Sequence, residues 1–189
     1  MLTTIRSLFL SVVLAVLAGC SALQFAEPYN PTIESGLDEY SKALTVFLKT
    51  QEQDGASPAT LYNSEESRDF YRQSEATLSN IVLQAEAGTN QRQCLPQLAA
   101  KLGVDTLLMN SSGLAQLQEN AAGDQRLAVA LQDGSCTVVV LKAVRANNRI
   151  LEAMHRKNGR LAPGAAALAR SLLEDSIRMA LRIEKAKKG

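Results

Sequence analysis

The sequence predicts an all-α protein, a four-helix up-down bundle with a long, partly ordered connection between its second and third helices. Apolar residues recur at steps of three and four along four stretches, which is the spacing of a helix with one buried face. Helix-starting prolines and helix-ending glycines punctuate these stretches. At 189 residues the chain has enough length for one domain with a sizeable core.

The first helix is predicted from Asn30 to about Glu52. Asparagine is a good N-terminal cap, and Pro31 suits the first helical position. A turn is expected at 54–58, where Gly55 and Pro58 disfavour a continued helix. The predicted buried face carries Ile33, Leu37, Tyr40, Leu44 and Phe47.

The second helix has two candidate starts. One is Ser57-Pro58, and the other is Asn63, with Glu66 three residues later as in a capping box. Gly88 is the expected end. Its predicted apolar side carries Phe70, Tyr71, Leu78, Ile81, Val82 and Ala85.

The connection that follows is the least regular part of the chain. Residues 95–102 have the pattern of a short helix. For residues 104–135 two alternatives stay open, short helices or a β-hairpin. In the hairpin, 127–132 and 136–141 would be the strands and Asp133-Gly134 the turn, since Asp-Gly favours tight hairpins.

The third helix is predicted from about Thr137 to Lys157 and ends at Asn158-Gly159. Its first turn contains three valines in a row, which are poor helix formers, so packing must hold that turn. Pro163 opens the fourth helix. The fourth apolar stripe is Ala165, Leu168, Ala169, Leu172, Leu173, Ile177, Ala180 and Leu181. Cations gather near its C-terminal end, where the helix dipole favours them: Arg178, Arg182, Lys185, Lys187 and Lys188.

Residues 1–19 have the form of a secretory signal. Arg6 precedes the apolar run 8–18, which is too short to span a bilayer. The sequence Leu17-Ala18-Gly19-Cys20 resembles the lipobox of bacterial lipoproteins. The resemblance implies that the signal is removed and that Cys20 carries diacylglycerol and a further acyl chain. The alternative is an ordinary signal peptide, with Cys20 a spare thiol.

This resemblance divides the chain into a removed signal (1–19), a lipidated N-terminus and tether (20–29) and a single helical-bundle domain (30–189). Ser21 follows Cys20, and no aspartate stands there. In Gram-negative members of the family this implies an outer-membrane location, with the domain facing the periplasm. The tether from Ser21 to Tyr29 spans at most about 30 Å, which keeps the domain close to the membrane.

The charges cancel over the predicted mature chain, which argues against nucleic acid as a partner. They are distributed unevenly, however, with an acidic balance over 20–90 and a basic balance over 91–189. Acidic early helices can lie beside basic late helices and screen them. Alternatively, a basic face is directed at an anionic lipid or polymer.

The two remaining cysteines, Cys94 and Cys136, are expected to form a disulfide, because the compartment beyond the inner membrane is oxidising. They lack the close spacing of a metal-binding or redox-active pair. The bond would close a loop of about 42 residues, which the chain-entropy model converts to about 4 kcal/mol.

Candidate chemistry is sparse. Glu152 and His155 share a helix face and form half of the metal-binding motif of di-iron bundles. Such a site needs a second histidine, and His155 is the only one in the chain, so the two residues are weak metal candidates. The alternative is that they form a solvated pair near the end of the helix. The sequence contains no nucleophile elbow and no glycine-rich phosphate loop. Asn147 and Ser176 interrupt apolar faces, and cross-bundle hydrogen bonds are expected there.

These observations predict a non-enzymatic envelope lipoprotein without a cofactor, attached to the membrane through its lipid anchor and binding another envelope protein or polymer. The alternative is a bundle that carries a small ligand or a metal ion. An enclosed pocket with converging polar groups would favour that alternative.

Overall fold

The computed structural model describes residues 28–54, 56–88 and 135–188. These residues form four α-helices and one short 3-10 helix, with no strand among them, which confirms the all-helical prediction for this part of the chain. The elements are α2 (Pro31–Gln53), η1 (Pro58–Thr60), α3 (Glu65–Gly88), α7 (Cys136–Asn158) and α8 (Pro163–Ala186).

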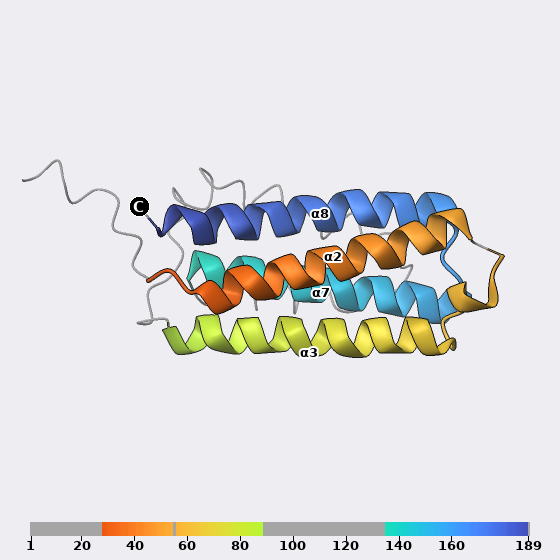
Figure 1. The fold of residues 1–189 in the computed structure, drawn as a ribbon, viewed down its shortest axis with the longest axis horizontal. Helices are drawn as coiled ribbons and strands as arrows, with labels where there is room; N and C mark the ends of the chain where they lie inside the picture. The colour runs from red at the N-terminus through yellow and green to blue at the C-terminus, as the bar shows by residue number, and fades with distance from the viewer. Residues whose placement is uncertain (1–27, 55, 89–134, 189) are drawn as a thin grey trace, which may run out of the picture.

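Each helix packs against two others. α2 contacts α3 and α8, and α7 contacts the same two helices (Figure 1). Two contacts orient the pair α2 and α8: the start of α2 meets the end of α8 through Asn30 and Glu184, and the end of α2 meets the start of α8 through Glu52 and Arg170. We call the end at which α2 starts and α8 ends the proximal end, and the opposite end the distal end.

Helix caps largely agree with the sequence. Asn30 caps α2 by accepting a hydrogen bond from the backbone N–H of Thr32, as predicted. The Ser135 side chain caps α7 through the N–H of Val138. α7 ends where Gly159 adopts a left-handed backbone with φ of 71°, a conformation that costs glycine little.

The two candidate starts of the second helix belong to separate elements. Ser57-Pro58 begins η1, and α3 begins only at Glu65. The cap of α3 is Ser64, whose hydroxyl accepts from the N–H of Ser67, rather than Asn63. The cap therefore lies one residue later than expected, and the residue three positions after it is Ser67 instead of a glutamate, so the predicted capping box does not form.

The hairpin alternative is wrong for its second strand. Residues 136–141 form the first turns of α7, because the N-cap of Ser135 and burial of the valines favour helix there. Val138, Val139 and Val140 are all buried, as expected if packing holds this turn. The other proposed strand, 127–132, lies outside the described residues.

The core runs the length of the helices and is mostly aliphatic, with aromatic rings gathered near the distal end. In α8 the buried face is rotated from the predicted stripe. Leu168 is 45 % exposed, whereas Ala166, Ile183 and Glu184 are buried. An apolar stripe does not predict burial of Glu184, which is buried because it pairs with Lys187 and the backbone N–H of Asn30.

Several predictions fall outside the described residues: the signal at 1–19, lipidation of Cys20, the tether up to residue 27, the short helix at 95–102 and the conformation of 104–134. Among the helices described here, none is both long and apolar enough to cross a membrane.

Candidate functional site

His155 lies in the distal core and is fully buried, so the expected solvated pair with Glu152 is wrong. Its Nε2 lies 3.0 Å from the carbonyl oxygen of Thr60, and its Nδ1 lies 3.0 Å from the hydroxyl of Tyr71. A carbonyl can only accept, so Nε2 carries the proton and Nδ1 accepts from the tyrosine. Both ring nitrogens are therefore engaged, and neither has a lone pair available for a metal ion.

Glu152 turns to a different partner. The hydroxyl of Tyr62 donates to its carboxylate at 3.1 Å, and the ring of Tyr62 packs edge-on to His155. Burial lowers the pKa of His155, and the Thr60 carbonyl only partly offsets that effect. The two residues singled out as metal candidates instead fasten the segment around η1 onto α7.

A polar layer crosses the middle of the core. Asn148 accepts a hydrogen bond of 3.0 Å from the buried hydroxyl of Tyr40, joining α7 to α2. Its neighbour Asn147 is also fully buried, but neither polar atom of its side chain has a partner. Ser176 donates to Leu172 in its own helix. The cross-bundle bond predicted for Asn147 is therefore made by Asn148 instead.

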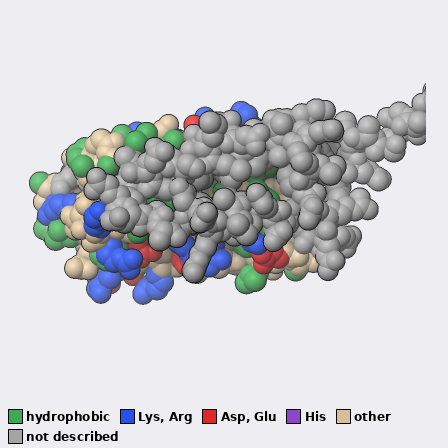
Figure 2. All heavy atoms as spheres, turned by 180° about the vertical axis from the view of Figure 1, so that it is seen from behind, with side chains coloured by type: hydrophobic (Ala, Val, Ile, Leu, Met, Phe, Trp, Pro, Cys, Tyr) green, Lys and Arg blue, Asp and Glu red, His purple; other side chains and the backbone are tan. Residues whose placement is uncertain are grey.

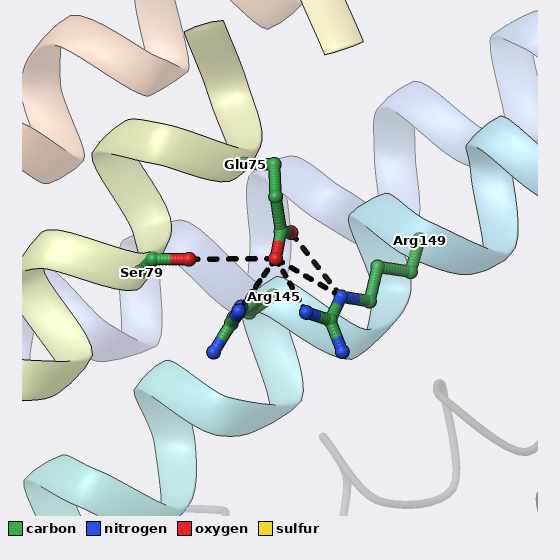
Figure 3. A network of polar contacts seen from close by, with 4 residues as sticks. All are labelled: Glu75, Ser79, Arg145 and Arg149. Atoms are coloured by element: carbon green, nitrogen blue, oxygen red, sulfur yellow. Dashed lines mark hydrogen bonds and ion pairs between the residues drawn. The ribbon is translucent and has the colours of Figure 1, made fainter. Parts of the chain in front are cut away.

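An ion-pair cluster joins α3 to α7 on the surface (Figure 3). Arg145 and Arg149, one turn apart on α7, both donate to the carboxylate of Glu75, Arg145 at 2.9 and 2.5 Å. Burial would raise the pKa of Glu75, but the two guanidinium groups outweigh it, and the pKa is lowered. Where described side chains are visible along the lower edge of Figure 2, basic and acidic groups lie together. This agrees with the expectation that acidic early helices lie beside basic late ones.

The chain enters the bundle at the proximal end through a clasp of three side chains. The Tyr29 hydroxyl donates to Glu34 at 2.5 Å, and Lys188 pairs with the same carboxylate at 2.7 Å. The ammonium of Lys188 also lies 4.4 Å from the centre of the Tyr29 ring. Lys188 and Tyr29 together lower the pKa of Glu34. The clasp ties the residues before α2 to the end of α8.

Glu184 reinforces this connection from inside the bundle. It is fully buried, accepts a 2.6 Å hydrogen bond from the backbone N–H of Asn30, and pairs with Lys187 at 2.9 Å. Beside it an open cavity of about 160 Å³ has both apolar and polar walls. It is smaller than the clefts of roughly 300–1,000 Å³ that usually hold small ligands. The cavity is lined by Pro28, Tyr29, Asn30, Pro31, Ile33, Gln84, Ala85, Gly88 and Lys187.

Sequence reasoning found the lysines of α8 but missed their partners. Glu34 and Lys188 are 154 positions apart, and no local pattern indicates that they meet. The available signal was the excess of lysines at the end of a helix, which predicted cations near the dipole but not the acids beside them. Glu184 is the acid that stands among those lysines in the sequence, and it is buried and bonded to the backbone of Asn30.

The cysteine predictions involve the proximal end as well. Cys136, the first residue of α7, is buried there, while Cys94 and Cys20 lie outside the described residues. The disulfide and the lipid anchor therefore stay predictions. Comparison of the chain with protein-family models, with curated proteins and with solved structures gives no match.

Proposed function

We propose that this chain is a lipid-anchored, non-enzymatic lipoprotein of the bacterial outer membrane, whose helical domain faces the periplasm and binds another component of the envelope. The observation that carries the proposal is the lipobox resemblance of Leu17-Ala18-Gly19-Cys20. The proximal clasp supports it, because a tether needs a firm attachment to the domain, and Tyr29 is held there by Glu34 and Lys188.

The finer description of the domain belongs to the same proposal. We infer an up-down bundle in which a long connection joins α3 to α7 and is fastened by a Cys94–Cys136 disulfide. The contacts at both ends of α2 and α8 support the antiparallel order. The end of α3 and the start of α7 lie at the same end of the bundle in Figure 1, which supports this order of the helices.

The alternative function, a carrier of a small ligand or metal ion, has less support. Its metal candidates were Glu152 and His155, and these side chains hold Tyr62, Tyr71 and the Thr60 carbonyl in place. The cavity at the proximal end is open and small, whereas a carrier needs an enclosed site with converging polar groups.

Metabolic labelling with palmitate, followed by membrane fractionation, tests the anchor. The full chain should incorporate label and sediment with outer membranes, and Cys20→Ala should incorporate none. The matched control is Cys94→Ala, which should keep the label in full. Label that persists in Cys20→Ala, or an unlabelled wild-type protein in the soluble fraction, would refute the anchor.

A further inference from the structure

Positive charge is concentrated at the proximal end. Residues 28–34, 85–88, 135–142 and 180–188 contain five basic and three acidic side chains, an excess of two positive charges. The corresponding distal residues, 48–54, 56–69 and 152–170, contain six of each and are balanced. The proximal basic residues are Lys142, Arg182, Lys185, Lys187 and Lys188, and the acidic ones are Glu34, Glu86 and Glu184.

Two of the proximal cations, Lys185 and Lys188, are more exposed than the acid that neutralises them. The side chains of Lys185 and Lys188 are 61 % and 48 % exposed, whereas that of their shared partner Glu34 is 23 % exposed and that of Glu184 is fully buried. Two lysines therefore share one carboxylate that lies beneath them. Lys142 pairs with Glu86 and Lys187 with the buried Glu184, so these four charges cancel. The charge that remains at this end is positive, because Arg182, Lys185 and Lys188 face solvent with only Glu34 beneath them.

The same end receives the tether. The chain enters the bundle at Pro28–Asn30, and Pro28 is only eight positions along the chain from Cys20. Eight extended residues reach no further than about 30 Å. A lipid on Cys20 would therefore hold the proximal end near the headgroups, while α2 extends roughly 35 Å away from that end.

We propose that the proximal end of the bundle is a second membrane contact, in which Lys185, Lys188 and Arg182 bind the headgroups of anionic phospholipids next to the anchor. This inference rests on the proposed lipid anchor for its geometry and names a membrane partner for the domain itself. Anionic headgroups match the exposed charge, and each lysine close to an anionic surface strengthens binding several-fold. The contact orients the bundle with its distal end away from the membrane.

Vesicle co-sedimentation tests the contact without the lipid anchor. The protein is the mature chain, residues 20–189, carrying Cys20→Ala. It should bind vesicles that contain phosphatidylglycerol, should bind neutral phosphatidylcholine vesicles much more weakly, and should dissociate as salt is raised, since exposed charges are screened within about 10 Å at 0.1 M. Equal binding to both vesicles, or binding to neither, would overturn the proposal.

Three variants locate the contact. Lys185→Gln with Lys188→Gln should lower partitioning onto anionic vesicles about 25-fold, at roughly fivefold for each lysine. Glu34→Gln removes an acid, leaves the lysines, and should raise partitioning about fivefold. The matched control, Arg156→Gln with Lys157→Gln at the distal end, should change it less than twofold. Equal losses from the proximal and distal pairs, or weaker binding by Glu34→Gln, would contradict the assignment.

These outcomes are separate from those of the anchor test. A chain that takes up palmitate through Cys20 but fails to bind anionic vesicles retains its proposed anchor and loses the second contact. A chain that binds anionic vesicles but takes up no palmitate loses the anchor, and with it the geometric argument for the contact.

Discussion

Two adjacent asparagines of α7 illustrate how differently one residue type acts in the core. Both are fully buried. Asn148 accepts from Tyr40 through its Oδ1 and links two helices, although its Nδ2 has no partner, whereas Asn147 leaves both polar atoms unpartnered. A buried polar group without a partner costs about 1–3 kcal/mol, and a buried hydrogen bond contributes about 1 kcal/mol net. The same substitution at the two positions should therefore act in opposite directions.

Asn147→Leu should raise the free energy of unfolding by about 1–2 kcal/mol, because leucine fills a similar volume and needs no partner. Asn148→Leu should lower it by about 1–3 kcal/mol, because the buried Tyr40 hydroxyl loses its acceptor. Urea denaturation followed by circular dichroism measures both, and each serves as the control for the other. Destabilisation of equal size at both positions would show that Asn147 has a partner in solution.

His155 should make stability depend on pH. Its pKa in the folded protein lies below the ordinary 6.5, so the unfolded chain binds the proton more readily. The histidine contribution is complete above pH 6.5 and is lost progressively as the pH falls below that value, towards the lowered pKa. Urea unfolding at pH 7.5 and at pH 5.5 should show this loss.

The matched variant is His155→Gln, which removes the titrating group. It should be less stable than wild type at pH 7.5, because the Tyr71 and Thr60 contacts are disturbed. Its stability should change less than that of wild type between the two pH values. An identical pH dependence in both proteins would assign the effect to other groups.

At the scale of elements, the close approach of α2 and α3 depends on one glycine. An added Cβ at Gly36 would lie 2.5 Å from Cγ2 of Ile81, too close for any van der Waals contact. Ile81 is buried and β-branched, so this methyl group moves only if its rotamer or the helix moves. Gly36 therefore sets the spacing of the two helices, although glycine is a poor helix former.

Gly36→Ala should destabilise the domain by about 1–3 kcal/mol, the usual cost of overpacking a core. The control is Gly164→Ala in α8, where nothing lies within 4 Å of the added Cβ and a gain of about 0.5–1 kcal/mol is expected. Thermal denaturation compares the two. If Ile81→Ala is combined with Gly36→Ala, the total loss should be smaller than the sum of the single losses.

Helical periodicity predicted the four helices well, because buried residues at steps of three and four leave a strong local pattern. The capping preference of asparagine, followed by proline, also identified Asn30 as a cap. Periodicity did not predict η1, the burial of His155 or the acid partners of the α8 lysines. Those depend on contacts such as Thr60 with His155, which are 95 positions apart and leave no local pattern in the sequence.

At the scale of the whole molecule, the predicted Cys94–Cys136 bond would connect the start of α7 to the chain between α3 and α7. Cys94→Ala and Cys136→Ala should each lower the free energy of unfolding, by up to about 4 kcal/mol. The double variant should have about the same free energy of unfolding as the less stable of the two single variants, because either change removes the same bond. Mass spectrometry without reductant should show the two cysteines joined, and free thiols would refute the bond.

The clasp at the proximal end also determines how the domain would bear mechanical load. A pull on the residues ahead of Pro28 meets Tyr29 and Asn30 first, and both are tied to α8 rather than to α2 alone. Tension would therefore be shared by the first and last helices before it reached the aromatic rings at the far end. When tension is applied through the N-terminal tether, α2 and α8 resist it together. Stretching the protein in optical tweezers should therefore break the Glu184 and Lys188 contacts first.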